Sequence, residues 1–164
     1  MRWKGSILAA AAFVLTGCGG GGKHAPPAAA ESASRLMAAA IAGDRVAFEA
    51  QIDRTALRED LRRQMVELAQ QRGVEVAGGP SDFALDRMIG PSALRLVRAG
   101  AGTPLAAAPT AAQLEQMLTT VGGKRACLPA PEAADRCLLT FAKAKNGWRL
   151  VGMQAMDLTI AVAG

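Results

Sequence analysis

Apolar residues recur every three or four positions over most of the chain before residue 122, which predicts amphipathic helices. The pattern predicts a helix from Glu31 that stops at Gly43, a short second segment after Asp44, and a longer helix over 53–72. The long helix carries an apolar stripe that consists of Leu57, Leu61, Met65 and Leu68. A stripe of this kind is typically buried against another element of the fold.

Shorter helices are predicted beyond a Gly-Pro-Ser break at 78–82. Apolar residues at 83–89 predict one of them, and Gly90-Pro91-Ser92 begins another that continues through Leu94 and Val97. After a loop rich in small residues, Thr110 is placed to cap a helix that runs to Val121 and stops at two glycines.

The pattern changes to strands in the last part of the chain. Residues 137–142 and 148–151 are rich in strand-forming residues and are separated by the turn Lys145-Asn146-Gly147. A further strand is predicted over 125–128, and residues 159–162 are a candidate for another. The sequence therefore predicts an α+β fold, with several N-terminal helices packed on a small C-terminal antiparallel β-sheet.

The N-terminal segment has the features of an export signal. Arg2 and Lys4 are followed by a short apolar run over 6–15, and Leu15-Thr16-Gly17-Cys18 then resembles the lipobox of bacterial lipoproteins. That resemblance implies a diacylglycerol group on Cys18. The alternatives are an ordinary secretory signal and a membrane anchor, although the apolar run is shorter than the roughly 20 residues that a bilayer requires.

The predicted organisation has three parts: a signal peptide over 1–17, a lipidated cysteine with a flexible Gly/Pro/Ala tether over 18–30, and a single α+β domain over 31–164. The lone His24 is interpreted as a solvated residue of the tether. Gly19 stands where an aspartate commonly retains Gram-negative lipoproteins in the inner membrane. The predicted location is therefore the outer membrane, facing the periplasm.

Composition narrows the class of protein. Hydrophobic residues make up 51% of the 164-residue chain and charged residues 20%, as in globular proteins. Arg2 and Lys4 account for two units of the net charge of +5, so the chain after the signal carries +3, with both signs mixed. We therefore predict no nucleic-acid partner. A single histidine and the absence of tyrosine argue against histidine-based triads and histidine-rich metal sites.

Cys127 and Cys137 lie ten positions apart, across a loop that contains Pro129 and Pro131. In an oxidising envelope this spacing favours a disulfide that closes a short hairpin. The chain-entropy model assigns such a closure a stabilisation of about 2–3 kcal/mol. Two free thiols are the alternative. A redox-active pair is disfavoured because the spacing is not C-x-x-C.

Three segments resemble the bacterial family called domain of unknown function 2939. They are residues 52–61 (IDRTALREDL), 85–91 (LDRMIGP) and 147–151 (GWRLV), which together place the resemblance over about 35–155. The resemblance implies a long helix, a second helix with a proline-led turn, and a closing strand. Arg54-Thr55 replaces the aromatic-Pro step with which the family opens its helix. The family brings no assigned activity and no catalytic residues.

No pattern in the sequence predicts a catalytic, metal or cofactor site. Gly-Pro-Ser at 90–92 lacks the G-x-S-x-G pattern of a nucleophile elbow, and the glycine runs lack the Gly-Lys-Ser/Thr ending of a phosphate loop. The acidic residues that could be searched for a carboxylate pair alternate with arginines, which favours a solvated helix face; they are Asp53, Glu59, Asp60, Glu67 and Glu75.

Two groups of side chains are candidates for binding. Arg54, Arg58 and Arg62 recur at helical spacing beside the apolar stripe and could contact anionic lipid or an acidic partner. Alternatively, their aliphatic stems cover the border of the stripe. Phe141 and Trp148 could line a cavity between sheet and helices, or could pack in the core.

Three functions remain open from the sequence. The first is a non-enzymatic, membrane-anchored lipoprotein that docks to another envelope protein or to the cell wall. The second is a module that binds a small molecule or lipid in an apolar pocket between helices and sheet. The third is a hydrolase that uses two carboxylates about 5–10 Å apart in a cleft. The oligomeric state is not predicted.

Overall fold

The computed structural model describes residues 24–74, 77–155 and 158–162. The predicted signal peptide over 1–17, the predicted lipidation site Cys18 and the acidic residue Glu75 lie outside the described residues.

The chain forms mainly helices first and strands last, which confirms the predicted α+β class. The helices are α1 (Pro27–Ala42), α2 (Arg45–Glu49), α3 (Arg54–Gln71), α4 (Asp82–Met88) and α5 (Ala111–Met117), with a 3₁₀ turn at Pro91–Ala93. The strands are β1 (Arg95–Arg98), β2 (Thr119–Val121), β3 (Arg125–Ala130), β4 (Ala133–Ala144), β5 (Gly147–Met153) and β6 (Thr159–Val162).

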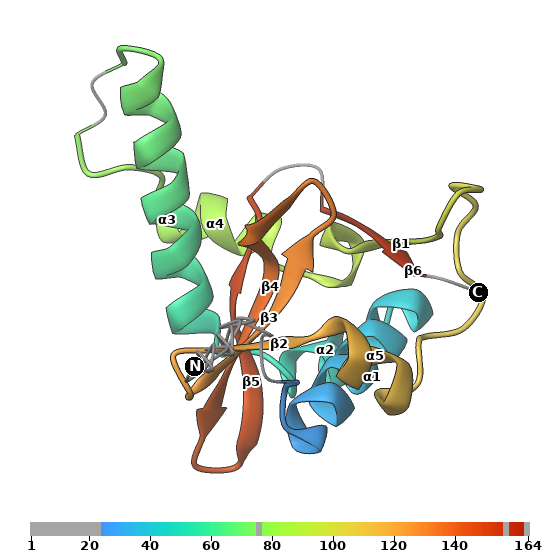
Figure 1. Ribbon diagram of the computed structural model, residues 1–164. Coiled ribbons are helices and arrows are strands. Elements are labelled where there is room, and N and C mark those ends of the chain that lie inside the picture. The colour runs from blue at the N-terminus through green and yellow to red at the C-terminus, as the bar shows by residue number, and fades with distance from the viewer. Residues whose placement is uncertain (1–23, 75–76, 156–157, 163–164) are drawn as a thin grey trace, which may run out of the picture.

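Four strands form an antiparallel sheet in the order β2-β3-β4-β5, and β1 and β6 form a separate parallel pair. Helices α1, α2 and α5 gather beside the sheet in the lower right of Figure 1. Helix α3 packs against β5 and extends well beyond the sheet, to the upper left of the same view (Figure 1).

Side-chain caps set the predicted starts of three helices. The side chains of Asp44, Asp53 and Thr110 accept backbone N–H groups at the N-termini of α2, α3 and α5. Thr110 and Gln113 form a reciprocal capping box. Gly43 ends α1 with φ 66°, a left-handed conformation that glycine adopts without a Cβ clash.

Helix α1 begins at Pro27, four residues before the predicted start at Glu31. Ala29 and Ala30 are fully buried, so the end of the predicted tether is the first turn of a packed helix. A run of alanines in a sequence is equally compatible with a linker and with a helix. Here the run is helical because the side chains of Ala29 and Ala30 are buried against the rest of the domain. The side chain of His24 is exposed, while its backbone forms a β-bridge with Thr119.

The predicted helix through Leu94 and Val97 is wrong. Only a 3₁₀ turn forms there, and Leu96 and Val97 lie in β1, which pairs with β6 more than 60 positions later. The predicted extension of α5 to Val121 is also wrong, because α5 ends at Met117 and Val121 lies in β2. Short apolar runs do not distinguish helix from strand, and the pairing partner decides.

The core lies between α1 and the four-stranded sheet. Phe141 on β4 stands opposite Leu150 on β5, and both are fully buried. Ser32 on α1 is the one buried polar side chain among the described residues. Its hydroxyl donates to the carbonyl of Trp148 at 2.7 Å. A buried donor with such a partner costs little to bury, and it fixes α1 against β5.

Helix α3 covers the outer edge of β5. The Asp60 carboxylate accepts the backbone N–H of Met153 at 3.2 Å. The Gln64 amide donates to the Met153 carbonyl at 2.8 Å and accepts the N–H of Ala155 at 3.0 Å. Earlier along this edge, the N–H of Leu150 donates to the backbone carbonyl of Gln51 at 2.9 Å. These bonds occupy groups that an exposed strand edge would offer to another strand.

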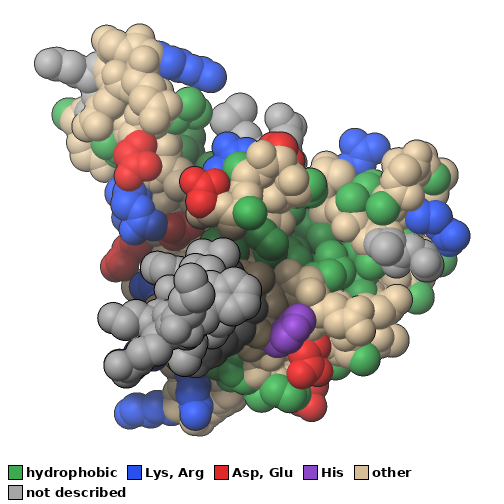
Figure 2. Space-filling view, viewed as in Figure 1, with side chains coloured by type: hydrophobic (Ala, Val, Ile, Leu, Met, Phe, Trp, Pro, Cys, Tyr) green, Lys and Arg blue, Asp and Glu red, His purple; other side chains and the backbone are tan. Residues whose placement is uncertain are grey.

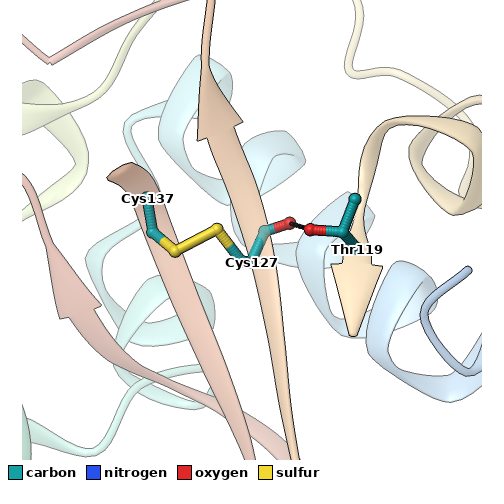
Figure 3. Close-up of a disulfide and its surroundings, with 3 residues drawn as sticks. All are labelled: Thr119, Cys127 and Cys137. Carbon is teal, nitrogen blue, oxygen red and sulfur yellow. Dashed lines mark hydrogen bonds between the residues drawn. A yellow bond between two sulfur atoms is a disulfide. The ribbon is translucent and has the colours of Figure 1, made fainter. Parts of the chain in front are cut away.

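The structure joins Cys127 on β3 to Cys137 on β4 by a disulfide, as predicted, with the two Cα atoms 5.4 Å apart (Figure 3). The strand register is irregular beside it, where Pro129 stands opposite Cys137. Because proline has no backbone N–H, it cannot donate to the ladder at this point. The disulfide therefore links the two strands beside a residue that cannot donate to the backbone ladder.

Candidate functional site

The three arginines singled out in the sequence hold neighbouring helices to α3. Arg54 pairs with Glu49 at the end of α2 and donates to Asp86 on α4 at 2.8 Å. Arg58 makes two bonds to Asp86, at 2.7 and 2.5 Å. We call this network the α3–α4 clasp; with the pair between Arg62 and Asp82 it comprises Glu49, Arg54, Arg58, Arg62, Asp82 and Asp86.

The clasp favours the ionised carboxylate. Hydrogen bonds from Arg58 and then Arg54 lower the pKa of Asp86 to about 2. The same bonds raise the pKa of both guanidinium groups, with Glu49 the largest influence on Arg54. The positive charges considered for lipid or partner contact are therefore engaged inside the domain. Sequence spacing did not reveal this role, because Asp86 follows Arg54 by 32 positions.

Phe141 and Trp148 are buried in the core, which supports the packing interpretation over the pocket. Ala126 on β3 pairs with Phe141, and Ser32 bonds to the backbone of Trp148. The cavities described below are lined by other residues.

The apolar stripe of α3 divides into two parts. Leu57 and Leu61 are fully buried, whereas Met65 and Leu68 are only partly buried and line a groove of about 430 Å³. In the space-filling view the C-terminal end of α3 stands out from the body at the upper left (Figure 2). We call this hollow the α3 groove; its lining is Gln64, Met65, Glu67, Leu68, Ala69, Gln71, Arg72, Val74, Met88, Arg136, Gln154 and Ala155.

The α3 groove is bounded by segments that are distant in sequence. One side is the distal half of α3, and the other contains Arg136 from β4 and the residues that follow β5. Met88, Gln154 and Ala155 also line an adjoining cavity of about 290 Å³, which reaches the 3₁₀ turn at Ser92. The two hollows thus share part of their lining.

A third hollow, also of about 290 Å³, lies where α3 meets the sheet and is lined mainly by polar residues, among them Glu59, Asp60, Arg63 and Arg125. The Asp60 carboxylate accepts bonds from Met153, Gln64 and Arg63. Its oxygens are therefore engaged in holding α3 to β5, which disfavours acid/base work by an Asp60 pair.

The sequence contained one signal for the groove, which was the length of the α3 stripe. Met65 and Leu68 belong to that stripe, but only the structure shows that they are partly exposed in a hollow. Arg136 and Ala155 carried no signal, because the topology alone brings β4 and the segment after β5 to α3. In the described ranges no three His, Cys, Asp or Glu side chains gather as metal ligands.

None of the helices formed by the described residues is long and apolar enough to cross a bilayer.

No protein-family model, curated protein or solved structure matches the chain. The resemblance to domain of unknown function 2939 therefore remains a prediction that rests on three short motifs.

Proposed function

We propose that this protein is a lipid-anchored, non-enzymatic protein of the bacterial envelope, and that its folded domain docks another envelope component through the α3 groove. The observation that carries the docking proposal is the division of the α3 stripe. Its first half is buried in the domain, and its second half lines an open groove of about 430 Å³. Partly exposed apolar side chains gathered in a depression are typical of an interaction site.

The anchoring proposal rests on Leu15-Thr16-Gly17-Cys18, which resembles a lipobox, after a short charged and apolar segment. Acyl chains on Cys18 would hold the protein at the membrane, since each buried methylene contributes about 0.8 kcal/mol. The disulfide between Cys127 and Cys137 is consistent with an oxidising compartment outside the cytoplasm. Gly19 favours the outer membrane, facing the periplasm.

The shape of the groove favours docking over enclosure of a small ligand. Pockets for small molecules typically bury 70–90% of the ligand surface. Here Val74 is 54% exposed, and three charged side chains at the rim are exposed as well. The apolar lining also suits a lipophilic small molecule. This second candidate has its own readout, because such a ligand would copurify and appear after organic extraction.

The anchor is tested by the intact mass of protein purified from membranes without reductant. We expect a chain that begins at Cys18, carries acyl groups and lacks the two hydrogens of the Cys127–Cys137 thiols. An unacylated chain that still begins at Met1 would overturn the anchoring proposal. Free thiols would contradict the disulfide.

Docking is tested in cells with a photo-crosslinking residue at Gln71, which is exposed and lines the groove. The matched control carries the same residue at Val46 on α2, which is 82% exposed and lies outside the groove lining. We expect one reproducible adduct from position 71 that is absent from position 46. The same random neighbours at both positions would overturn docking through this surface.

A further inference from the structure

The charges around the α3 groove differ from those of the rest of α3. Across the groove and its adjoining cavity, the described residues supply three exposed cations, Arg72, Arg87 and Arg136, and one exposed anion, Glu67. We call the three arginines the basic rim. The clasp arginines, by contrast, all pair with acidic residues of the domain.

The basic rim is available to a partner. Arg72, at the C-cap of α3, has no ion pair within the described ranges, and Arg87 lies over the ring of Phe83 at 6.0 Å. Arg136 pairs with Glu132 at 3.0 Å, but these side chains are 56% and 66% exposed. Surface pairs of this kind contribute little and exchange readily for another carboxylate.

The lining between these cations suits a helix. Met65 and Met88 are adaptable side chains, and Ala69 and Ala155 are small enough to let a partner backbone approach closely. The distal part of α3, from Gln64 to Gln71, is about 10 Å long at 1.5 Å per residue, which matches about two helical turns. An added β-strand is disfavoured, because Asp60 and Gln64 already occupy the β5 edge beside the groove.

We propose that the occupant of the α3 groove is an amphipathic helix of another envelope protein, with an apolar face flanked by Asp and Glu residues. The proposal rests on the docking function proposed above and names the chemistry of the partner. The apolar face fills the groove through residues at helical spacing, and the acidic flanks meet the basic rim.

The first test identifies the peptide that is photo-crosslinked to position 71. We expect a segment with apolar residues at i, i+3 or i+4 and i+7, flanked by acidic residues. A segment with basic flanks or a two-residue apolar alternation would overturn the proposal, although docking itself would stand. A phospholipid adduct would overturn it as well and would identify the occupant as lipid.

The second test reverses the rim charges with the double variant Arg72→Glu/Arg136→Glu. We expect the adduct yield from position 71 to fall at least about tenfold, since the glutamate at each of the two positions then repels an acidic flank. Replacing the partner's flanking acids with lysine should restore the yield with this variant. The control Arg45→Glu/Lys124→Glu makes the same charge change at exposed positions outside the groove and should leave the yield unchanged.

The two tests separate the proposals. An adduct at position 71 that survives the rim reversal unchanged overturns the acidic helix but keeps the docking site. If the protein with its rim arginines unaltered forms no specific adduct from position 71, the docking function itself is overturned. Circular dichroism spectra of the rim and control variants should match that of the parent, because neither pair of residues belongs to the core or the clasp.

Discussion

The hydroxyl of Ser32 on α1 donates a 2.7 Å hydrogen bond to the backbone carbonyl of Trp148 on β5, across 116 positions of sequence. This bond is buried, and it fixes the first helix to the sheet. Ser32→Ala would leave the carbonyl without that donor. We expect the free energy of unfolding to fall by about 1–3 kcal/mol, measured by urea unfolding followed by circular dichroism.

Ser92→Ala is the control for this measurement, because Ser92 is exposed on the 3₁₀ turn. Its effect should stay within about 0.5 kcal/mol of the parent. Equal effects of the two substitutions would show that the Ser32 bond adds nothing to stability.

Gly152 on β5 lies against Asp60 of α3. A Cβ at this position would stand 3.0 Å from a carboxylate oxygen of Asp60 and 3.3 Å from the Cβ of Thr140. Gly152→Ala should therefore displace Asp60 from the Met153 N–H and destabilise the domain by about 1–3 kcal/mol. Because Asp60→Ala removes the obstructing oxygen, the double variant should be less destabilised than the sum of the two single effects. Additive effects in this unfolding cycle would contradict the contact.

The α3–α4 clasp makes the free energy of unfolding depend on pH in the acid range. The pKa of Asp86 is about 2 in the folded chain, against an ordinary value of 3.8, so folding favours its ionised form. Its contribution is complete above about pH 4 and is lost as the pH falls towards 2. We expect Asp86→Asn to be less stable than the parent at neutral pH, with the difference shrinking between pH 4 and 2. A constant difference in urea unfolding across that range would contradict this assignment.

The disulfide stabilises one side of the α3 groove. Cys137 follows Arg136, which lines the groove, and the carbonyl of Leu138 accepts the N–H of Gln154 at 3.0 Å. Replacing both cysteines with alanine should cost about 2–3 kcal/mol by the loop-entropy model. It should also accelerate trypsin cleavage after the exposed Arg136, while cleavage after Arg45 on α2 serves as the control. Equal acceleration at both sites would indicate global unfolding rather than a local effect.

Local sequence signals predicted those parts of the fold that local physics determines. Asp44, Asp53 and Thr110 begin helices because their own side chains bind N–H groups a few residues later. The turn before Gly147 likewise joins two neighbouring strands that pair with each other. Each of these features requires residues close in sequence and nothing from the rest of the chain.

The remaining features depend on partners that are distant in sequence. Leu96 and Val97 are strand residues because β6 lies beside them, and their short apolar run is equally compatible with a helix. The role of Arg58 in the clasp depends on Asp86, which the fold brings to it. The α3 groove depends on where the covering elements end, and the α3 stripe alone does not contain that information.

The two edges of the four-stranded sheet have different neighbours, and this separates the proposed anchor from the proposed docking site. The chain enters the domain at His24, whose backbone pairs with Thr119 at the β2 edge, whereas α3 and its groove lie at the β5 edge, about 14 Å away across three strand spacings. Cys18 precedes His24 by six positions, a reach of at most about 22 Å. With Cys18 acylated as proposed, the β2 edge is held near the lipid headgroups. The groove lies at the other edge of the sheet, so a partner can bind there without displacing the segment that leads to the anchor.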